Sequence, residues 1–141
     1  MEVKPDWGND SGLFFRTTEN GAAYQITMDY LQGGSMGRLI GEGGIDCDCP
    51  RRSPGQADPG LSAWKSDDWN SVRIRVVGDA PHATVWINDE QVTDAADTAN
   101  HAVEGMAAGP LAIQVHGGAQ RWQPGGLWRW RTIAVRELGR P

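Results

Sequence analysis

Gln114 and His116 stand two residues apart in the segment 109–118 and directly precede two glycines. Side chains of an extended strand alternate between its faces, so both polar groups would project from the same face. A histidine titrates near neutral pH and can act as a general base, while a carboxamide can donate a hydrogen bond to a hydroxyl or carbonyl oxygen. The opposite face carries three apolar residues and is predicted to face the core: Leu111, Ile113 and Val115.

Other polar side chains fall on neighbouring predicted strands. Arg16 follows an apolar pair in segment 11–18, and Gln25 and Asp29 share one face of segment 22–31. A guanidinium on an open sheet face can stabilise a developing anion or orient a carboxylate. The alternative for Arg16 is an ion pair with a neighbouring strand, with Asp29 as its partner.

The chain contains seven tryptophans among 141 residues, and aromatic rings pack well against the C–H faces of sugars. Trp86 is expected on the same side as Asn88, and Trp122 in a loop. For both rings, sugar stacking and plain packing stay open. The late arginines, Arg131 among them, alternate with apolar residues and are interpreted as strand and groove positions rather than as a phosphate-binding track.

The two cysteines, Cys47 and Cys49, lie in the segment IDCDCP. A disulfide between residues two apart is badly strained, so we expect no bridge here. The pair could chelate a soft metal, but no second Cys/His pair completes a zinc site. The alternative is a polar loop with two thiols.

Glycines and prolines divide the chain into short segments rich in β-branched and aromatic residues. Turn-marked segments of this kind, with little helical periodicity, predict an all-β sandwich or barrel in one domain, residues 1–141. The expected strands are 11–18, 22–31, 36–41, 69–78, two strands within 82–94, 109–117 and 127–138. Residues 42–68 form a loop long enough to be functional, and 95–108 a connection with one helical turn.

The net charge of −5 and the pI of about 5.0 argue against a nucleic-acid partner, which would need a basic face. No apolar run is long enough to span a membrane, and no signal peptide is recognised. The opening MEVKPDWG has the pattern of a strand, so we expect earlier strands to be missing. A missing strand exposes a sheet edge, and open edges favour a homodimer.

Seven segments occur in a familiar order: NDSGLFFRT, YQITMD, MGRLIGEGG, DDWNSVRIRVVG, TVWINDEQVTD, GPLAIQVHG and WRTIAVREL. Together they resemble the 3-keto-disaccharide hydrolase family over residues 7–138. The resemblance implies a concanavalin-like jelly-roll sandwich of two antiparallel sheets and a secreted or periplasmic location. Relatives usually carry Glu after the tyrosine, where this chain has Gln25, and often Gln where it has Thr27.

The resemblance also implies cleavage of glycosides whose sugar carries a ketone at C3. A base removes the proton from C2, the enolate expels the oxygen at C1, and water then adds. We assign catalytic roles to four residues, with His116 as the base: His116, Arg16, Gln114 and Asp29. Six residues are predicted to bind substrate: Gln25, Glu42, Trp86, Asn88, Trp122 and Arg131. Asp29 or Glu42 could hold a divalent cation that polarises the ketone.

Two further hypotheses compete with the enzyme. A carbohydrate-binding module of the same fold would bind sugar without cleaving it, and Gln25 in place of Glu favours that reading. An interaction domain would present an exposed apolar patch instead of a polar groove.

Overall fold

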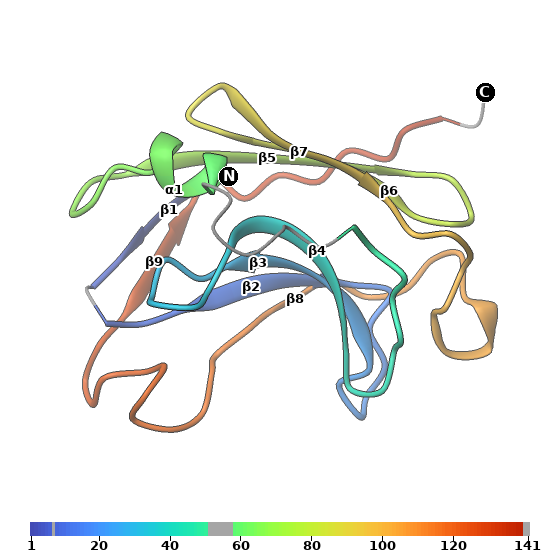
Figure 1. Ribbon diagram of the computed structural model, residues 1–141, viewed down its shortest axis with the longest axis horizontal. Coiled ribbons are helices and arrows are strands. Elements are labelled where there is room, and N and C mark those ends of the chain that lie inside the picture. Colours follow the sequence, from blue (N-terminus) through green and yellow to red (C-terminus); the bar gives the residue numbers. More distant parts are fainter. Residues whose placement is uncertain (7, 51–57, 140–141) are drawn as a thin grey trace.

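The structure is a computed structural model that describes residues 1–6, 8–50 and 58–139. Two antiparallel sheets stack as layers (Figure 1), which confirms the predicted all-β sandwich. The five-stranded sheet has the order β7-β6-β5-β1-β9 and contains β1 (Glu2–Pro5), β5 (Asn70–Val77), β6 (His82–Ile87), β7 (Glu90–Ala96) and β9 (Trp128–Arg131). The four-stranded sheet has the order β4-β3-β2-β8 and contains β2 (Ser11–Phe15), β3 (Ala23–Met28), β4 (Met36–Glu42) and β8 (Ala112–Ile113).

The core lies between the sheets because each strand turns one face of alternating apolar residues inward. On β3, Tyr24, Ile26 and Met28 are almost fully buried, and Val85 and Ile87 on β6 are equally buried. Burial of such side chains contributes about 1.5–3 kcal/mol each. The intervening residues of β3 therefore point away from the core, and this second face positions the candidate site.

Helical structure is limited to α1 (Pro59–Ala63) and the single 3₁₀ turn η1 (Val103–Gly105) among the described residues. Asp58 begins α1, its carboxylate accepting hydrogen bonds from the backbone N–H groups of Gly60 and Leu61. The helix falls within the predicted loop 42–68, of which residues 51–57 lie outside the described part of the chain. In the described residues, no helix is both long and apolar enough to cross a membrane.

The prediction that one face of segment 109–117 belongs to the core is wrong. The alternation is present, but Leu111, Ile113 and Val115 are 48%, 40% and 74% exposed. Only Ala112 and Ile113 pair as β8, and β8 is the edge strand of its sheet. An edge strand has neighbours on one side only, so its apolar side chains lack the cover that a central strand receives.

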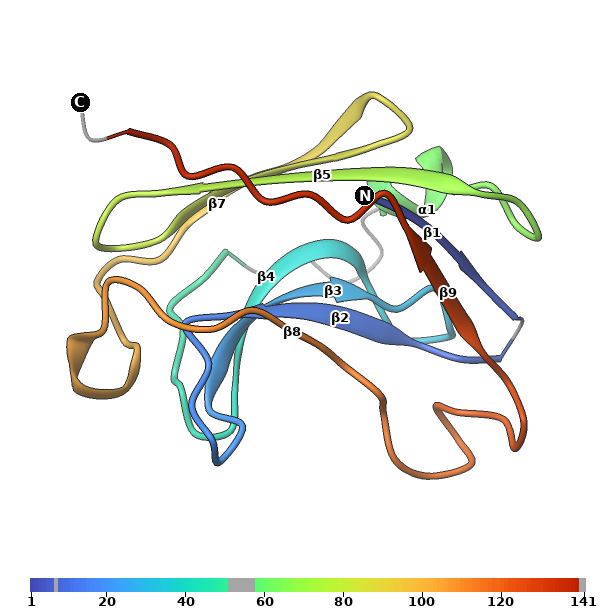
Figure 2. The ribbon, with the colours of Figure 1, turned by 180° about the vertical axis from the view of Figure 1, so that it is seen from behind.

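The last predicted strand is also shorter than expected. β9 ends at Arg131, and Thr132 has a φ of 54°, in the left-handed region that an extended strand cannot contain. The chain beyond it runs along the five-stranded sheet without strand structure (Figure 2), and Ile133 and Val135 are exposed.

The expectation of unbridged cysteines is wrong as well. Cys47 and Cys49 form a disulfide, with their Cα atoms 5.2 Å apart. This separation lies within the usual Cα–Cα span of a disulfide.

Candidate active site on the outer face of the four-stranded sheet

Strand register gathers the polar residues on one face. Gln25 on β3 lies opposite Phe14 on β2, and Phe14 lies opposite Ala112 on β8, so these three share the face directed away from the core. The backbone N–H of Gln114 donates to the carbonyl of Gly12 at 2.9 Å, which continues the pairing beyond Ile113. Gln114 therefore falls on the same face, as its alternation with Ala112 predicts.

Gln25 and Gln114 are hydrogen-bonded through their side chains. The Nε2 of Gln25 donates to the Oε1 of Gln114 at 2.7 Å, across the intervening strand β2. Gly12 makes this contact feasible, because a Cβ at that position would lie 2.0 Å from the Gln25 Nε2. Gln25 is only 3% exposed and Gln114 is half-buried, so the pair offers an ordered donor and acceptor at the sheet surface.

His116 is paired with Asp10. The Nδ1 of His116 lies 2.8 Å and 2.9 Å from the two carboxylate oxygens of Asp10, which is 4% exposed. An ionised carboxylate only accepts, so Nδ1 carries the proton and donates it to Asp10. In the neutral ring, Nε2 then has a free lone pair and can accept a proton. The His116 side chain is 42% exposed, so part of the ring faces solvent.

Neighbouring contacts hold Asp10 in position. Its backbone N–H donates to the carbonyl of Arg121 at 3.0 Å, and the Oδ1 of Asn9 accepts from the backbone N–H of Gln123 at 2.7 Å. On the other side, the Ser11 hydroxyl donates to the carbonyl of Gln114 at 2.7 Å. The start of β2 is thus joined both to the end of β8 and to the loop 117–126, which brings Asp10 to His116.

Asp29 adds a second carboxylate, engaged by the loop 117–126. The Nη1 of Arg121 donates to both oxygens of Asp29, at 3.1 Å and 2.9 Å. Burial raises the pKa of Asp29, and the negative charge of Asp10 raises it further, whereas Arg121 and His116 lower it. The backbone hydrogen bond from Asp10 to Arg121 joins the His116–Asp10 pair to the Arg121–Asp29 pair, so the four residues form one local cluster.

Loops border this face at both ends of the four-stranded sheet. Figures 1 and 2 show the loop 117–126 extending beyond the outer face at one end, and the loops 16–22 and 43–47 at the other. The face is thus a mixed surface, on which Phe14, Ile40 and Ala112 lie beside Gln25, with a charged cluster next to one loop. This arrangement can bind a small polar ligand and move a proton at its edge.

A comparison with known protein families gives a match to almost the whole chain. The sequence matches the 3-keto-alpha-glucoside-1,2-lyase-like domain over residues 1–136. The chain belongs to this family. No curated protein and no solved structure gives a significant match. The family description indicates a glycoside-cleaving activity on 3-keto sugars and a carbohydrate as substrate.

In this member of the 3-keto-alpha-glucoside-1,2-lyase-like family, Arg16 is not on the polar face. Its Nη1 and Nη2 donate to the backbone carbonyls of Asp79 and Gly78, in the turn between β5 and β6, and the residue is buried. A φ of 51° at Arg16 reverses the alternation that the strand pattern predicts. The predicted ion pair with Asp29 is therefore absent, and Arg121 takes that place.

Three predicted substrate-binding residues belong to the five-stranded sheet instead. The ring of Trp86 lies beneath the Arg73 guanidinium at 4.0 Å, on the outer face of that sheet. Asn88 forms the β6–β7 turn with a φ of 49°, and its side chain donates to the carbonyl of Ala63. Arg131 forms an ion pair with Glu2 on β1. The alternation of side chains along a strand does not show which sheet the strand joins. Sequence patterns therefore group Trp86, Asn88 and Arg131 with the candidate site, although they belong to the other sheet.

Trp122 and Glu42 lie nearer to the polar face. Trp122 is half-buried in the loop 117–126, where its indole N–H donates to the carbonyl of Gly126 at 3.2 Å. Glu42 ends β4 and pairs with Ala23, at the opposite end of the sheet from Asp29. The described residues place no cluster of metal ligands at Asp29 or Glu42, so we assign no step to a cation there.

Sequence reasoning missed Asp10 and the role of Arg121. Asp10 precedes β2 and lies 106 residues from His116, while Arg121 lies 92 residues from Asp29. The only sequence signal was the position of Asp10 beside a strand start, because the pairing itself depends on how β8 aligns with β2.

Proposed function

We propose that this protein cleaves 3-keto-glycosides by eliminating the substituent at C1, with the Nε2 of His116 as the base. The observation that carries this proposal is the Asp10–His116 pair, which leaves Nε2 available on the face that also bears Gln114. Family membership supplies the substrate class. The arrangement needs no pair of opposed carboxylates of the kind that ordinary glycosidases use.

The chemistry follows from the ketone at C3, which makes the C2 hydrogen acidic. His116 takes this proton, and the C2–H electron pair forms the C2–C3 enolate. When the enolate collapses, C3 regains its carbonyl, a C1–C2 double bond forms, and the C1–O bond breaks. The departing oxygen takes the proton back from the imidazolium, and water can then add across the new double bond. Asp10 stabilises the imidazolium while it exists, as a carboxylate does in hydrolase triads.

The enolate oxygen needs a donor, and the polar face offers two. The Gln114 carboxamide accepts from Gln25, which orients its NH₂ group as a donor toward a sugar oxygen. The Arg121 guanidinium, held by Asp29 and by the carbonyl of Gln32, supplies positive charge beside the Asp10–His116 pair. In this proposal Gln114 keeps its predicted role, and Arg121 takes the role predicted for Arg16.

The test is sugar release from a panel of 3-keto-glucosides, run beside the same glucosides without the ketone. We expect cleavage of the keto forms only, and His116→Ala is expected to lower turnover by about two orders of magnitude or more with the fold intact by circular dichroism. Equal cleavage of the unoxidised glucosides would contradict the elimination route. Full activity in His116→Ala would remove His116 as the base.

A carbohydrate-binding module is the second candidate, and the neutral Gln25–Gln114 pair favours it. Two carboxamides bind sugar hydroxyls well but transfer no proton. In that case the 3-keto-glucosides would bind without being cleaved, and Gln25→Glu becomes the first variant to test for restored turnover.

A further inference from the structure

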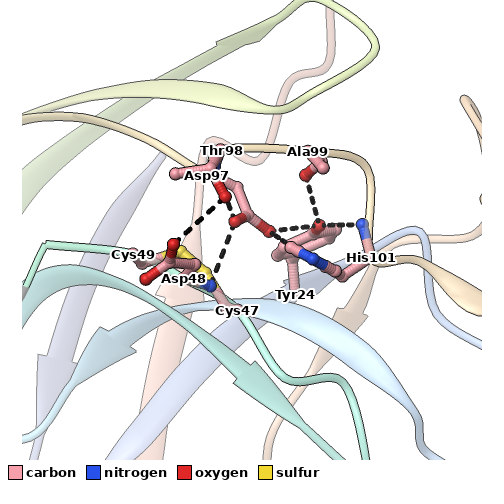
Figure 3. The surroundings of a disulfide bond; sticks show 8 residues. All are labelled: Tyr24, Cys47, Asp48, Cys49, Asp97, Thr98, Ala99 and His101. Atoms are coloured by element: carbon pink, nitrogen blue, oxygen red, sulfur yellow. Dashed lines mark hydrogen bonds and ion pairs between the residues drawn. A yellow bond between two sulfur atoms is a disulfide. The ribbon is translucent and has the colours of Figure 1, made fainter.

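A second cluster lies outside the polar face, between the loop after β4 and the end of β7. The sulfur atoms of Cys47 and Cys49 and a carboxylate oxygen of Asp97 all lie within 4.8 Å of one another (Figure 3). Cys49 and Asp97 are buried, and Cys47 is half-buried. Buried ligand-type atoms at this spacing have no part in the proposed glycoside chemistry.

Asp97 is held firmly by its neighbours. Its Oδ1 accepts from the backbone N–H groups of Asp48, at 3.0 Å, and Thr98, at 2.8 Å. Its Oδ2 accepts from the Tyr24 hydroxyl at 2.7 Å and lies 2.8 Å from the His101 Nδ1. Carboxylates that ligate metals are themselves hydrogen-bonded in this way, and binding of an ion by Asp97 requires one of these four contacts to lengthen.

Among these contacts, the hydrogen bond from the backbone N–H of Asp48 to Asp97 bears most directly on the cysteines, because Asp48 lies between them in the sequence. Its N–H joins the cysteine loop to Asp97 through a hydrogen bond that does not involve the sulfur atoms. The Thr98 hydroxyl also bonds the Asp48 carboxylate, at 3.2 Å. Reduction of the disulfide would therefore leave both thiols beside the Asp97 carboxylate, within reach of one ion.

A pocket gives access to this cluster. It has a volume of about 610 Å³ and is lined by the cysteine loop together with Thr98 and His101. The carboxylates of Asp46 and Asp48 also line it, so the local charge attracts a cation. Water from this pocket can supply a remaining coordination position.

We propose that Cys47, Cys49 and Asp97 form a redox-gated site for a thiophilic divalent cation, with Zn²⁺ as the probe. The disulfide is the closed form. A dithiol opens it by thiol–disulfide exchange: the Cys47–Cys49 bond receives two electrons, the dithiol becomes a cyclic disulfide, and its two protons pass to the cysteines. Zn²⁺ then displaces both thiol protons and bonds two sulfurs and one carboxylate oxygen.

The ligand types and spacing favour a zinc-like ion. Thiolates prefer soft or borderline ions over Mg²⁺ and Ca²⁺, which take oxygen ligands. With Zn–S bonds of about 2.3 Å, two ligands of one ion lie no more than about 4.6 Å apart. The three atoms lie within 4.8 Å of one another, and once reduction breaks the S–S bond the two sulfur atoms must move apart for one ion to bind both.

The test compares Zn²⁺ affinity in the oxidised and reduced full-length protein. The protein is first reduced with dithiothreitol, and the dithiothreitol is then removed under nitrogen so that the thiols stay reduced. The reduced protein is titrated with Zn²⁺ in competition with a chromophoric chelator. We expect one ion per chain in the reduced form and about 100-fold weaker binding in the oxidised form and in Cys49→Ser. Asp97→Asn should weaken binding about tenfold or more. Asp94→Asn, which changes an exposed carboxylate on the same strand β7, should leave binding unchanged.

A synthetic peptide of residues 45–50 distinguishes a three-ligand site in the folded protein from chelation of Zn²⁺ by two nearby thiols alone. The peptide has both cysteines but lacks Asp97, so it should bind Zn²⁺ at least about tenfold more weakly than the reduced protein. This comparison also decides the matter if Asp97→Asn fails to fold. Equal affinity of peptide and protein would overturn the proposal, as would a disulfide that dithiothreitol cannot open in the folded chain. The readout does not depend on activity toward 3-keto-glycosides.

Discussion

His116 has one ring nitrogen available because Asp10 occupies the other. The carboxylate accepts the Nδ1 proton and so selects the tautomer in which Nε2 is a base. The described part of the chain contains two further His–Asp pairs: His82 with Asp94, which is exposed on the five-stranded sheet, and His101 with Asp97 in the cysteine cluster. The three pairs have similar chemistry but different surroundings, and among them it is the His116–Asp10 pair that lies next to Gln114 in the chain and beside the Asp29–Arg121 pair.

We predict that Asp10→Asn lowers kcat about tenfold or more with little change in KM. The amide NH₂ can donate to Nδ1, which favours the tautomer with the proton on Nε2 and removes the base. Steady-state kinetics on a cleaved 3-keto-glucoside provides the measurement. Asp94→Asn is the matched control and should retain the parent kcat. Equal effects of both variants would contradict a special role for Asp10.

At the scale of single strands, β2 makes the Gln25–Gln114 contact possible because it has glycine at position 12. The absence of a Cβ lets Gln25 reach across β2 to Gln114. We predict that Gly12→Ala displaces the Gln25 carboxamide and raises KM about tenfold, the value of roughly one hydrogen bond to substrate. Gly139→Ala, where nothing lies within 4 Å of the added Cβ, should leave KM unchanged. An unaltered KM in Gly12→Ala would show that the Gln25–Gln114 contact does not help to bind substrate.

Strands β1 and β9 are joined by two ion pairs, Glu2–Arg131 and Asp6–Arg129. Hydrogen bonds from the arginines lower the pKa of Glu2 and of Asp6 below their unfolded values. The resulting stabilisation is therefore present above about pH 4.5 and is lost as the pH falls through the lowered folded-state values.

We predict that the melting temperature falls below about pH 4.5, and falls less steeply in the double variant Glu2→Gln/Asp6→Asn. Because both carboxylates are largely exposed, the difference should be small and should shrink further in high salt. Thermal denaturation at a series of pH values tests this. Parallel pH curves for parent and variant would show that other carboxylates govern the acid response.

At the scale of the whole molecule, β8 presents an open sheet edge with exposed apolar side chains at Leu111, Ile113 and Val115. An edge of this kind can pair with the edge of a second copy. The homodimer expected from the sequence stays a prediction, and β8 is the edge at which we place it.

We predict that sedimentation velocity detects a concentration-dependent dimer and that Val115→Lys shifts it toward monomer. A charge on an edge strand opposes edge-to-edge pairing. Leu61→Lys, at an exposed apolar residue of α1, is the control and should leave the association unchanged. A parent protein that remains monomeric at every concentration would rule out this dimer.

The sequence by itself determined the all-β class and the alternation of faces in most strands, whereas the two-sheet arrangement was implied only by the family resemblance. The class and the alternation follow from short-range rules: β-branched residues at every second position form half-buried strands, and glycines with prolines end them. Strand alternation placed Gln114, His116 and Gln25 on one face, and in the structure Gln25 is hydrogen-bonded to Gln114, while His116 pairs with Asp10. The same rules placed Arg16 on that face, where a left-handed backbone angle turns it away.

Only the tertiary structure decided which strands are neighbours, and hence which side chains meet. Asp10 and His116 lie 106 residues apart and meet because β8 pairs with β2. Trp86 and Arg131 alternate correctly yet lie on the other sheet, and Cys47 and Cys49 reach Asp97 only through the packing of the β4 and β7 loops. Alternation is a local property of the backbone, whereas sheet order and loop packing depend on contacts between distant segments, which no short pattern encodes.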